Sequence, residues 1–383
     1  MDFDESPEHA DLRAAVAKIC AGFGDGYFRR VVDEDGRTDE LWRALGEAGF
    51  LGVNLPEEHG GGGAGITELA IVIEETAAAG MPLLLMLVSA AISGEVLKEF
   101  GTPEQRRRWL PAMASGAEKM VFAITESDAG SNSHQLRTTA RRDGDGWVLE
   151  GAKHYISGVD EAANLLVVAR TGTGGSGEGE MTLFVVPTDA ENLRRSRIPV
   201  ELRAPEKQYT LSFDGVRVGD DRRVGEVGAG LRIVFRGLNP ERIGGAAIET
   251  GIARYALAKA ARYANERSVW GVPIGRHQGV AHPLAAAAVD VELARLMTAK
   301  AAWLHDAGRP AGEASNMAKY SAADAALKAL DAAIQAHGGN GLASEYGLAH
   351  LWGMARLLKI APVSREMILN YVASHTLGLP KSY

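Results

Sequence analysis

The sequence predicts an α+β fold of several domains, in which two helical regions flank a β-domain. Up to about Met113, apolar residues recur at helical spacing, as Leu41 and Leu45 do in the stretch DELWRALGEAGFLG. After Glu118 the chain changes to short β-branched and aromatic runs separated by turn residues. From about Gly230 it returns to long alanine- and leucine-rich segments, which are typical of bundle helices. We therefore expect an N-terminal α-helical domain (1–117), a middle β-domain (118–229) and a C-terminal helical bundle (230–383).

The N-terminal domain is expected to consist of amphipathic helices joined by turns. The stretch ITELAIVIEETAAAG repeats the helical spacing, and LPEEHGGGGAG before it is a loop rich in glycine and proline. The most apolar run, MPLLLMLVSAAISG, is too short to span a bilayer and predicts a buried helix. The basic run RRRW at residues 106–109 is typical of a solvated helix face.

The middle domain is expected to take its strands from GWVLEGAKHYISG, ANLLVVAR, MTLFVVP and YTLSFDGVRV. Between two of these segments, GTGGSG at residues 172–177 fits the G-x-G-x-x-G pattern of dinucleotide-binding loops. That fingerprint requires a helix directly afterwards, whereas the next segment here is a strand. We therefore interpret these glycines as a hairpin loop.

The C-terminal region begins with the stretch LNPERIGGAAIE, residues 238–249, followed by long helical segments that we expect to pack around the N-terminal helices. Asn239 could cap a helix there, and Pro240 suits its first turn, so Glu241 would lie within that turn. An acid at a helix start usually complements the helix dipole and contributes about 0.3–1 kcal/mol. The alternative is that Glu241 removes a proton from a substrate.

The composition excludes several classes of protein. With 383 residues, 46% of them hydrophobic and 23% charged, the chain is typical of a soluble globular protein. The net charge of −8 argues against general nucleic-acid binding, because no basic excess would neutralise phosphates. The single cysteine, Cys20, excludes disulfides and cysteine-based metal sites within the chain. The acidic start has no apolar core, so we expect no signal peptide, no membrane span and a cytoplasmic location.

The segment FAITESDAGSNSH, residues 122–134, carries the most chemical information. Thr125 and Ser131 offer hydroxyl groups that could contact a ligand. Downstream, GAKHYISG ends a strand with the aromatic Tyr155 and the hydroxyl of Ser157. By itself, the first segment could equally be an ordinary polar loop.

Five motifs, in order, resemble those of the acyl-CoA dehydrogenase family of flavoproteins over nearly the whole chain. They are LGEAGFLGVNLPEEHGGGGAG, TESDAGSN, EGAKHYIS, YANERSVWGVPIGRHQ and AIQAHGGNGLASEY. The resemblance implies an N-terminal helical domain, a middle β-barrel-like domain and a C-terminal four-helix bundle. It also implies bound FAD, an acyl-CoA substrate, an electron-transfer flavoprotein as electron acceptor, and a homotetramer built from dimers.

The resemblance implies a role for each matching residue. Thr125 and Ser131 would contact FAD or the thioester chain, Tyr155 would lie against the isoalloxazine edge, and the Ser157 hydroxyl would approach flavin N5. Arg267 would reach the FAD of a neighbouring subunit, where guanidinium pairs with phosphate, rather than form a surface salt bridge. The residues implied for FAD are Phe122, Ile124, Thr125, Ser131, Tyr155, Ser157, Arg267, Trp270, Gln278, Gln335, Gly338, Gly339 and Ser364. Those implied for the substrate are Ser131, Asn239 and Arg242.

The chain departs from the family's motifs at Ser127, Asn132, Met354 and Pro362, and the last departure concerns the catalytic base. Many members carry I-Y-E-G-T near the end of the chain, and that glutamate abstracts the α-proton. Here IAPVSREM has Pro362 in that position, and proline cannot accept a proton. Subgroups resembling isovaleryl-CoA and long-chain acyl-CoA dehydrogenases carry the base in an E-R segment instead, which LNPERI matches. The resemblance therefore implies Glu241 as the base.

The implied activity is the α,β-dehydrogenation of an acyl-CoA thioester to the trans-2-enoyl-CoA. Glu241 would take the α-proton and flavin N5 the β-hydride. A backbone N–H at Ser364 or a neighbour would polarise the thioester carbonyl. Two alternatives stay open: a flavin monooxygenase or oxidase on the same scaffold, and a non-catalytic partner subunit in a mixed oligomer.

Overall fold

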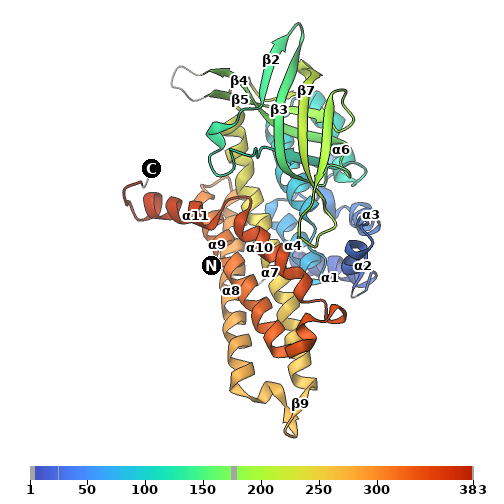
Figure 1. Ribbon diagram of the computed structural model, residues 1–383, viewed down its shortest axis with the longest axis vertical. Coiled ribbons are helices and arrows are strands. Elements are labelled where there is room, and N and C mark those ends of the chain that lie inside the picture. Colours follow the sequence, from blue (N-terminus) through green and yellow to red (C-terminus); the bar gives the residue numbers. More distant parts are fainter. Residues whose placement is uncertain (1–4, 25, 174–178, 382–383) are drawn as a thin grey trace.

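The computed structural model describes residues 5–24, 26–173 and 179–381 and has the three-part order expected from the sequence (Figure 1). The N-terminal helices are α1 (Pro7–Ala21), α2 (Tyr27–Asp33), α3 (Asp39–Glu47), α4 (Ile66–Ala78), a π-helical segment (Met86–Gly94), α5 (Glu95–Phe100) and α6 (Pro103–Ala114). The apolar run forms the buried π-helical segment, as expected. Among the described residues, no helix is long and apolar enough to cross a membrane.

The middle domain is a single mixed sheet. Its strands are β1 (Met120–Ala123), β2 (Thr139–Asp143), β3 (Gly146–Ser157), β4 (Asn164–Thr173), β5 (Gly179–Pro187), β6 (Leu193–Ile198), β7 (Gln208–Gly219) and β8 (Arg223–Val224). They pair in the order β6-β7-β3-β2-β4-β5-β8, with β1 parallel to β4. The sheet is not closed, because β6 and the two-residue β8 form its two edges, so the barrel-like description applies only loosely.

The glycine-rich segment at residues 172–177 connects two antiparallel strands, β4 and β5. A strand follows it, as expected, and so the dinucleotide fingerprint is excluded. Residues 174–178 of this segment lie outside the described residues.

The first C-terminal helix, α7, spans Gly230–Glu266, and the helix start expected at Asn239 is therefore wrong. Pro240 lies inside the helix, where its missing N–H costs about 3 kcal/mol. The preceding turns bury Ile233 and Val234 against the rest of the protein, and this packing favours a continuous helix. Glu241 consequently lies in the helix interior, which excludes a dipole role at a helix start.

The C-terminal bundle consists of α7, α8 (Gln278–Asp306), α9 (Gly312–His337) and the shorter α10 (Trp352–Ile360), which packs on α9 and α7. The last helix is α11 (Arg365–Tyr371). A hairpin of β9 (Ser268–Val269) and β10 (Val272–Pro273) connects α7 to α8 at the end of the bundle far from the sheet (Figure 1). Helix α7 begins at Gly230 and strand β1 at Met120. The domain limits expected at residues 117 and 229 stay predictions.

The two helical domains pack around one another, as expected, with α4 against α7 and α8. Buried Glu74 and Glu75 of α4 bind three arginines from three helices: Arg13 of α1, Arg254 of α7 and Arg295 of α8. The carboxylate of Asp306, at the end of α8, accepts hydrogen bonds from the first two backbone N–H groups of α4, at 2.8 and 2.9 Å. These contacts join α4 to α1, α7 and α8.

Candidate active site

Glu241 lies in a buried part of the bundle, with only 7% of its surface exposed. Among the described residues, its Oε2 atom has no hydrogen-bond partner. Burial raises the pKa of this carboxyl group to about 8, while the charges of Arg242 and Lys319 oppose that rise.

Asn239 and Arg242 lie beside Glu241 on α7, as the sequence requires, and they bind each other. The Arg242 Nη1 atom donates a hydrogen bond to Asn239 Oδ1 at 3.1 Å. Burial lowers the pKa of Arg242, and the neighbouring charge of Glu241 opposes the shift. The side chains of Asn239 and Arg242 therefore lie at the same site as Glu241.

The loop that carries Pro362 lies at this site as well. Lys319 of α9 donates a hydrogen bond from Nζ to the Val363 carbonyl oxygen at 2.8 Å, and its charge also acts on Glu241. Ser364 accepts a hydrogen bond at Oγ from the Met367 N–H at 3.3 Å and so caps α11. The two positions at which the family carries its base thus meet around one lysine.

The TESDAGSN segment follows β1, and a buried ion pair holds it against β3. Lys153 is fully buried, and its Nζ donates to Glu126 Oε1 at 2.8 Å and to the Ile124 carbonyl oxygen at 2.9 Å. The Glu126 carboxylate also accepts the backbone N–H groups of Arg137 and Thr138 at 2.6 and 3.0 Å. Burial would raise the pKa of Glu126, but Lys153 and these donors lower it overall.

The middle-domain residues predicted for FAD surround this ion pair. Phe122 is buried at the end of β1, and Ile124 and Thr125 are half-buried, while Ser131 is exposed. The Thr125 carbonyl oxygen accepts the His154 N–H at 2.8 Å.

Two further residues predicted for FAD lie at the end of β3. Ser157 donates from Oγ to Gln208 Oε1 at 3.0 Å. Tyr155 is more than half exposed and has a φ of 57°, which is rare for a residue with a side chain. The structure therefore presents an exposed aromatic ring and a hydroxyl group two residues apart.

The residues predicted for the FAD of a neighbouring subunit gather at the far end of the bundle. Arg267 ends α7, Gln278 begins α8, and Gln335, Gly338 and Gly339 lie where α9 ends; all five are exposed. A Cβ atom added at Gly338 or Gly339 would meet no described atom within 4 Å, so ligand and backbone can approach closely there.

Trp270 belongs to the same group and has an unusual conformation. It lies in the two-residue turn between β9 and β10, with a φ of 53°, and is 88% exposed. Two-residue hairpin turns with positive φ at both positions ordinarily use asparagine, aspartate or glycine. An exposed indole ring at such a turn position is therefore unusual.

Within one chain, the two groups of predicted residues are far apart. Glu241 lies in α7 and Arg267 directly follows its last residue, so a rise of about 1.5 Å per residue separates them by about 39 Å along the helix axis. Figure 1 shows the sheet and the β9 hairpin at opposite ends of the molecule. Glu241 therefore lies far from Arg267, which belongs to the residues predicted for the FAD of a neighbouring subunit.

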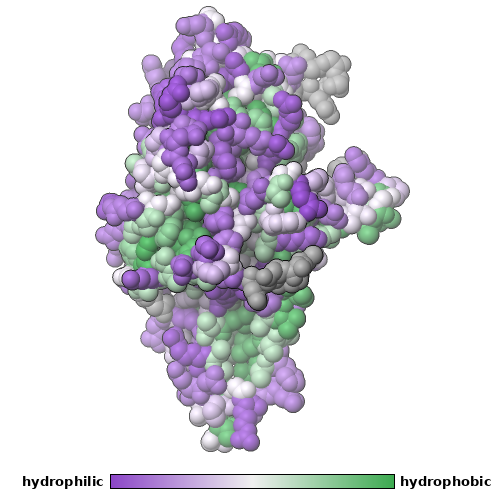
Figure 2. Space-filling view, turned by 180° about the vertical axis from the view of Figure 1, so that it is seen from behind, coloured by the Kyte–Doolittle hydropathy of each residue, from purple (hydrophilic) through white to green (hydrophobic). Residues whose placement is uncertain are grey.

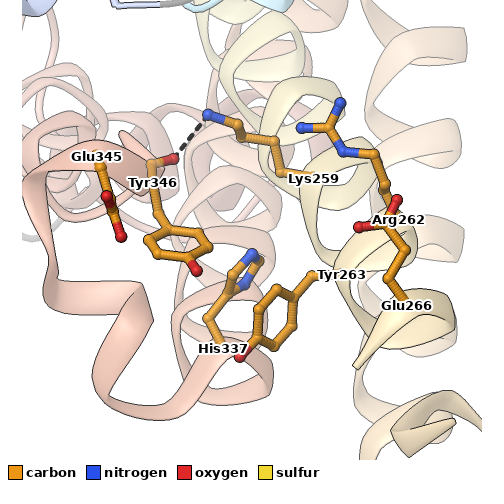
Figure 3. A pocket seen from close by; sticks show the side chains of 7 residues that line it. All are labelled: Lys259, Arg262, Tyr263, Glu266, His337, Glu345 and Tyr346. Atoms are coloured by element: carbon orange, nitrogen blue, oxygen red, sulfur yellow. Dashed lines mark hydrogen bonds between the residues drawn. The ribbon is translucent and has the colours of Figure 1, made fainter. Parts of the chain in front are cut away.

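A pocket of about 350 Å³ adjoins the second group (Figure 3). The ring of Tyr263 stacks on His337 with their centroids 4.2 Å apart, and the Lys259 Nζ atom donates to the Tyr346 carbonyl oxygen at 2.7 Å. The remaining lining residues are Arg262, Glu266 and Glu345. The neighbouring glycines belong to a recognisable motif, whereas these side chains come from separate segments of the chain and no motif marks them.

Three sequence models of the acyl-CoA dehydrogenase family match the chain. The N-terminal domain matches residues 6–117, the middle domain residues 121–216 and the C-terminal domain residues 228–377. The chain belongs to the acyl-CoA dehydrogenase family. It is an acyl-CoA dehydrogenase and hence an oxidoreductase.

Individual relatives agree with this assignment. The acyl-CoA dehydrogenase FadE12 of Mycobacterium tuberculosis is 53% identical, over all of this chain and 99% of its own. The short-chain specific acyl-CoA dehydrogenase of Bos taurus is 34% identical over 99% of this chain and 92% of its own. A glutaryl-CoA dehydrogenase from Mycobacterium smegmatis, solved with FADH2, has a TM-score of 0.91 at 25% identity, covering 99% of this chain and 96% of that one. Such acyl-CoA dehydrogenases are FAD-dependent enzymes.

Proposed function

We propose that this acyl-CoA dehydrogenase converts an acyl-CoA thioester to the trans-2-enoyl-CoA, with Glu241 as the base that removes the α-proton. The observation that carries the proposal is the position of Glu241: a buried carboxyl group with an unpartnered oxygen, beside the loop in which Pro362 replaces the family's other base. Burial gives this carboxyl a pKa of about 8, a range suited to proton abstraction near neutral pH.

We infer that FAD binds at the end of the sheet and supplies the hydride acceptor, flavin N5. The residues there fit a flavin, since Tyr155 offers an exposed ring and Ser157 a hydroxyl group. Phe122, Ile124, Thr125 and Ser131 would complete this half of the site. A positive φ at a tyrosine costs of order 1–3 kcal/mol, a cost that a binding role explains.

We further propose that the adenine half of each FAD is held by a second subunit. Arg267, Trp270 and Gln278, with Gln335, Gly338 and Gly339, lie too far from Glu241 to serve the same cofactor within one chain. The guanidinium group of Arg267 suits the pyrophosphate, and Trp270 can cover a ring.

This arrangement requires an oligomer, and a homotetramer is the form we propose. Exposed apolar residues of α8, Val289, Leu293, Leu296 and Trp303, support it. Figure 2 shows hydrophobic side chains gathered over the lower part of the bundle. An electron-transfer flavoprotein is the proposed electron acceptor.

For the substrate, we propose that Asn239, Arg242 and Ser131 contact the acyl-CoA. A backbone N–H at Ser364 or a neighbour would donate a hydrogen bond to the thioester carbonyl oxygen. That bond would strengthen as negative charge develops on the oxygen, so it would stabilise the transition state. The bound thioester would also exclude water from Glu241 and raise its proton affinity.

Replacing Glu241 by glutamine tests the proposal. The variant should stay folded, bind FAD and bind ligand, yet anaerobic reduction of its flavin by acyl-CoA should slow by several orders of magnitude. Glu249→Gln is the matched control, because it removes a second buried carboxyl group of the same helix and should retain reduction. Near-normal reduction of Glu241→Gln would refute the assignment of the base.

The same measurement separates the alternatives. A non-catalytic partner subunit would be yellow but would not bleach with any acyl-CoA thioester. A monooxygenase or oxidase would consume oxygen on reoxidation rather than pass electrons to an electron-transfer flavoprotein.

A further inference from the structure

A second buried carboxyl group, that of Glu249, lies on the same side of α7 as Glu241. At about 100° per residue, the two side chains point about 80° apart around the helix, with Gly245 between them. Glu249 is only 1% exposed. Among the described residues, neither of its oxygens has a hydrogen-bond partner. A buried carboxylate without a donor is costly, so its protonation state needs an explanation.

The helix leaves open space between the two carboxyl groups. A Cβ atom at Gly245 would meet only one described atom within 4 Å, Leu358 Cδ2 at 4.0 Å. At the neighbouring Gly244, by contrast, it would lie 2.9 Å from Leu87 Cδ1. Because glycine has no side chain, nothing at position 245 screens Glu241 and Glu249 from one another.

Lys319 of α9 is the cation that faces both groups. It is 1% exposed, and its charge acts on Glu249 and on Glu241. Among the described residues no carboxylate lies within 4.0 Å of its Nζ atom, whose hydrogen bond goes to the Val363 carbonyl oxygen. The charge of one ammonium group thus acts on two carboxyl groups without forming a close ion pair with either.

The other charged groups around this cluster favour ionisation of Glu241 over that of Glu249. Glu241 has two cations near it, Arg242 and Lys319. Glu249 also faces Asp324, a like charge, and Lys359, which is already paired with Asp324 at 2.5 Å. Further charged or titratable neighbours are Arg365, which also pairs with Asp324 at 3.3 Å, Glu366, near Lys319, and Tyr371, near Arg242.

The direction of the pKa shifts agrees with this difference. Burial raises the pKa of Glu249 well above its usual value, with Lys319 opposing and Asp324 reinforcing the shift. Burial lowers the pKa of Lys319 to about 8, and the two glutamates oppose that change. Because the groups interact, they titrate as a unit.

We propose that Lys319 is a positioning residue that favours the ionised form of Glu241, the base, whereas Glu249 holds a proton and stays neutral. This inference rests on the proposed function. During the reaction the α-C–H bond would break and its proton would form an O–H bond on Glu241. The electron pair of that bond would form the α,β double bond, and the β-C–H bond would break with its electron pair as the hydride that FAD accepts. Glu249 keeps its proton throughout, so the charge of Lys319 compensates one carboxylate only.

The first test is the pH dependence of anaerobic flavin reduction in the holoenzyme. For the wild type we expect the rate to rise with pH through the raised pKa of Glu241, since the protonated acid cannot accept a proton. Lys319→Met should move the midpoint of this rise up by at least about one pH unit, a tenfold change in proton concentration. Lys319→Arg should restore the wild-type midpoint, and Lys359→Met, the matched control, should leave it unchanged.

The variant Glu249→Gln tests whether Glu249 is neutral or ionised. If Glu249 is already neutral, the midpoint stays where it is in the wild type. A shift of the midpoint to lower pH would mean that an ionised Glu249 competes for Lys319, and would overturn the proposal. An unchanged midpoint in Lys319→Met would overturn it as well.

Infrared spectroscopy without substrate provides a readout that is independent of activity. At alkaline pH the wild type should have a band from one buried protonated carboxyl group, and Glu249→Gln should lose it. Lys319→Met should gain a second band, which the double variant with Glu241→Gln should lack. If Glu241→Gln is reduced normally but these bands behave as described, the proposed base is wrong and the charge assignment stands. Persistence of the first band in Glu249→Gln would refute the charge assignment itself.

Discussion

Replacing Lys153 by methionine tests whether a buried ion pair holds the segment proposed to bind FAD. Methionine keeps an unbranched side chain but removes the ammonium group that donates to Glu126 and to the Ile124 carbonyl oxygen, at 2.8 and 2.9 Å. Removing one partner of a buried pair costs about 3–5 kcal/mol. Since the backbone N–H groups of Arg137 and Thr138 still bind Glu126, we expect the lower end of this range, about 3 kcal/mol.

Hydrogen exchange at the Arg137 and Thr138 amides measures this loss locally. A decrease of about 3 kcal/mol in the free energy of opening corresponds to about a hundredfold faster exchange. Lys328→Met is the control, because Lys328 forms an exposed pair with Asp290 that should contribute less than about 1 kcal/mol.

A double variant adds a second check of the same reasoning. Lys153→Met combined with Glu126→Gln should be less destabilised than Lys153→Met, because no uncompensated charge remains buried. Wild-type exchange at both amides in Lys153→Met would refute the role of the ion pair.

Two other predictions concern the proposed cofactor site. Arg267→Ala should lose FAD on dilution while its helices, followed by circular dichroism, stay folded; full flavin content at low protein concentration would contradict a site shared between subunits. Ser157→Ala should stay yellow but have a shifted flavin absorption band and slower reduction by substrate, because a hydroxyl group near N5 is removed. An identical spectrum and rate would exclude Ser157 from the flavin site.

The start of α7 was mispredicted because the local signals there are outweighed by distant contacts. Asn239 and Pro240 resemble a helix start, and within a short window nothing contradicts that interpretation. The helix nevertheless continues back to Gly230, since the turn with Ile233 and Val234 is buried against other elements. Propensity is a weak influence when tertiary packing supplies several kcal/mol.

The site residues could be predicted only in part from the sequence, for a similar reason. Glu241, Tyr155 and Ser157 were predicted because each lies in a short motif that can be recognised along the chain. Lys319 and Glu249 were not, because no motif marks them and their importance comes from the packing of α9 against α7. A lysine inside an alanine-rich helix has the same sequence signature whether it is exposed or buried.

The sequence by itself determined the order of helical and β-domains, the family, and the identity of the residues proposed for catalysis. Hydrophobic periodicity and short motifs are local properties, so they can be detected without knowing which segments meet. Only the tertiary structure decided that the sheet is open, that Glu241 lies inside a long helix, and that two acids share one lysine. Those features depend on contacts between residues far apart in the chain, and on the loss of water around charges that such contacts produce.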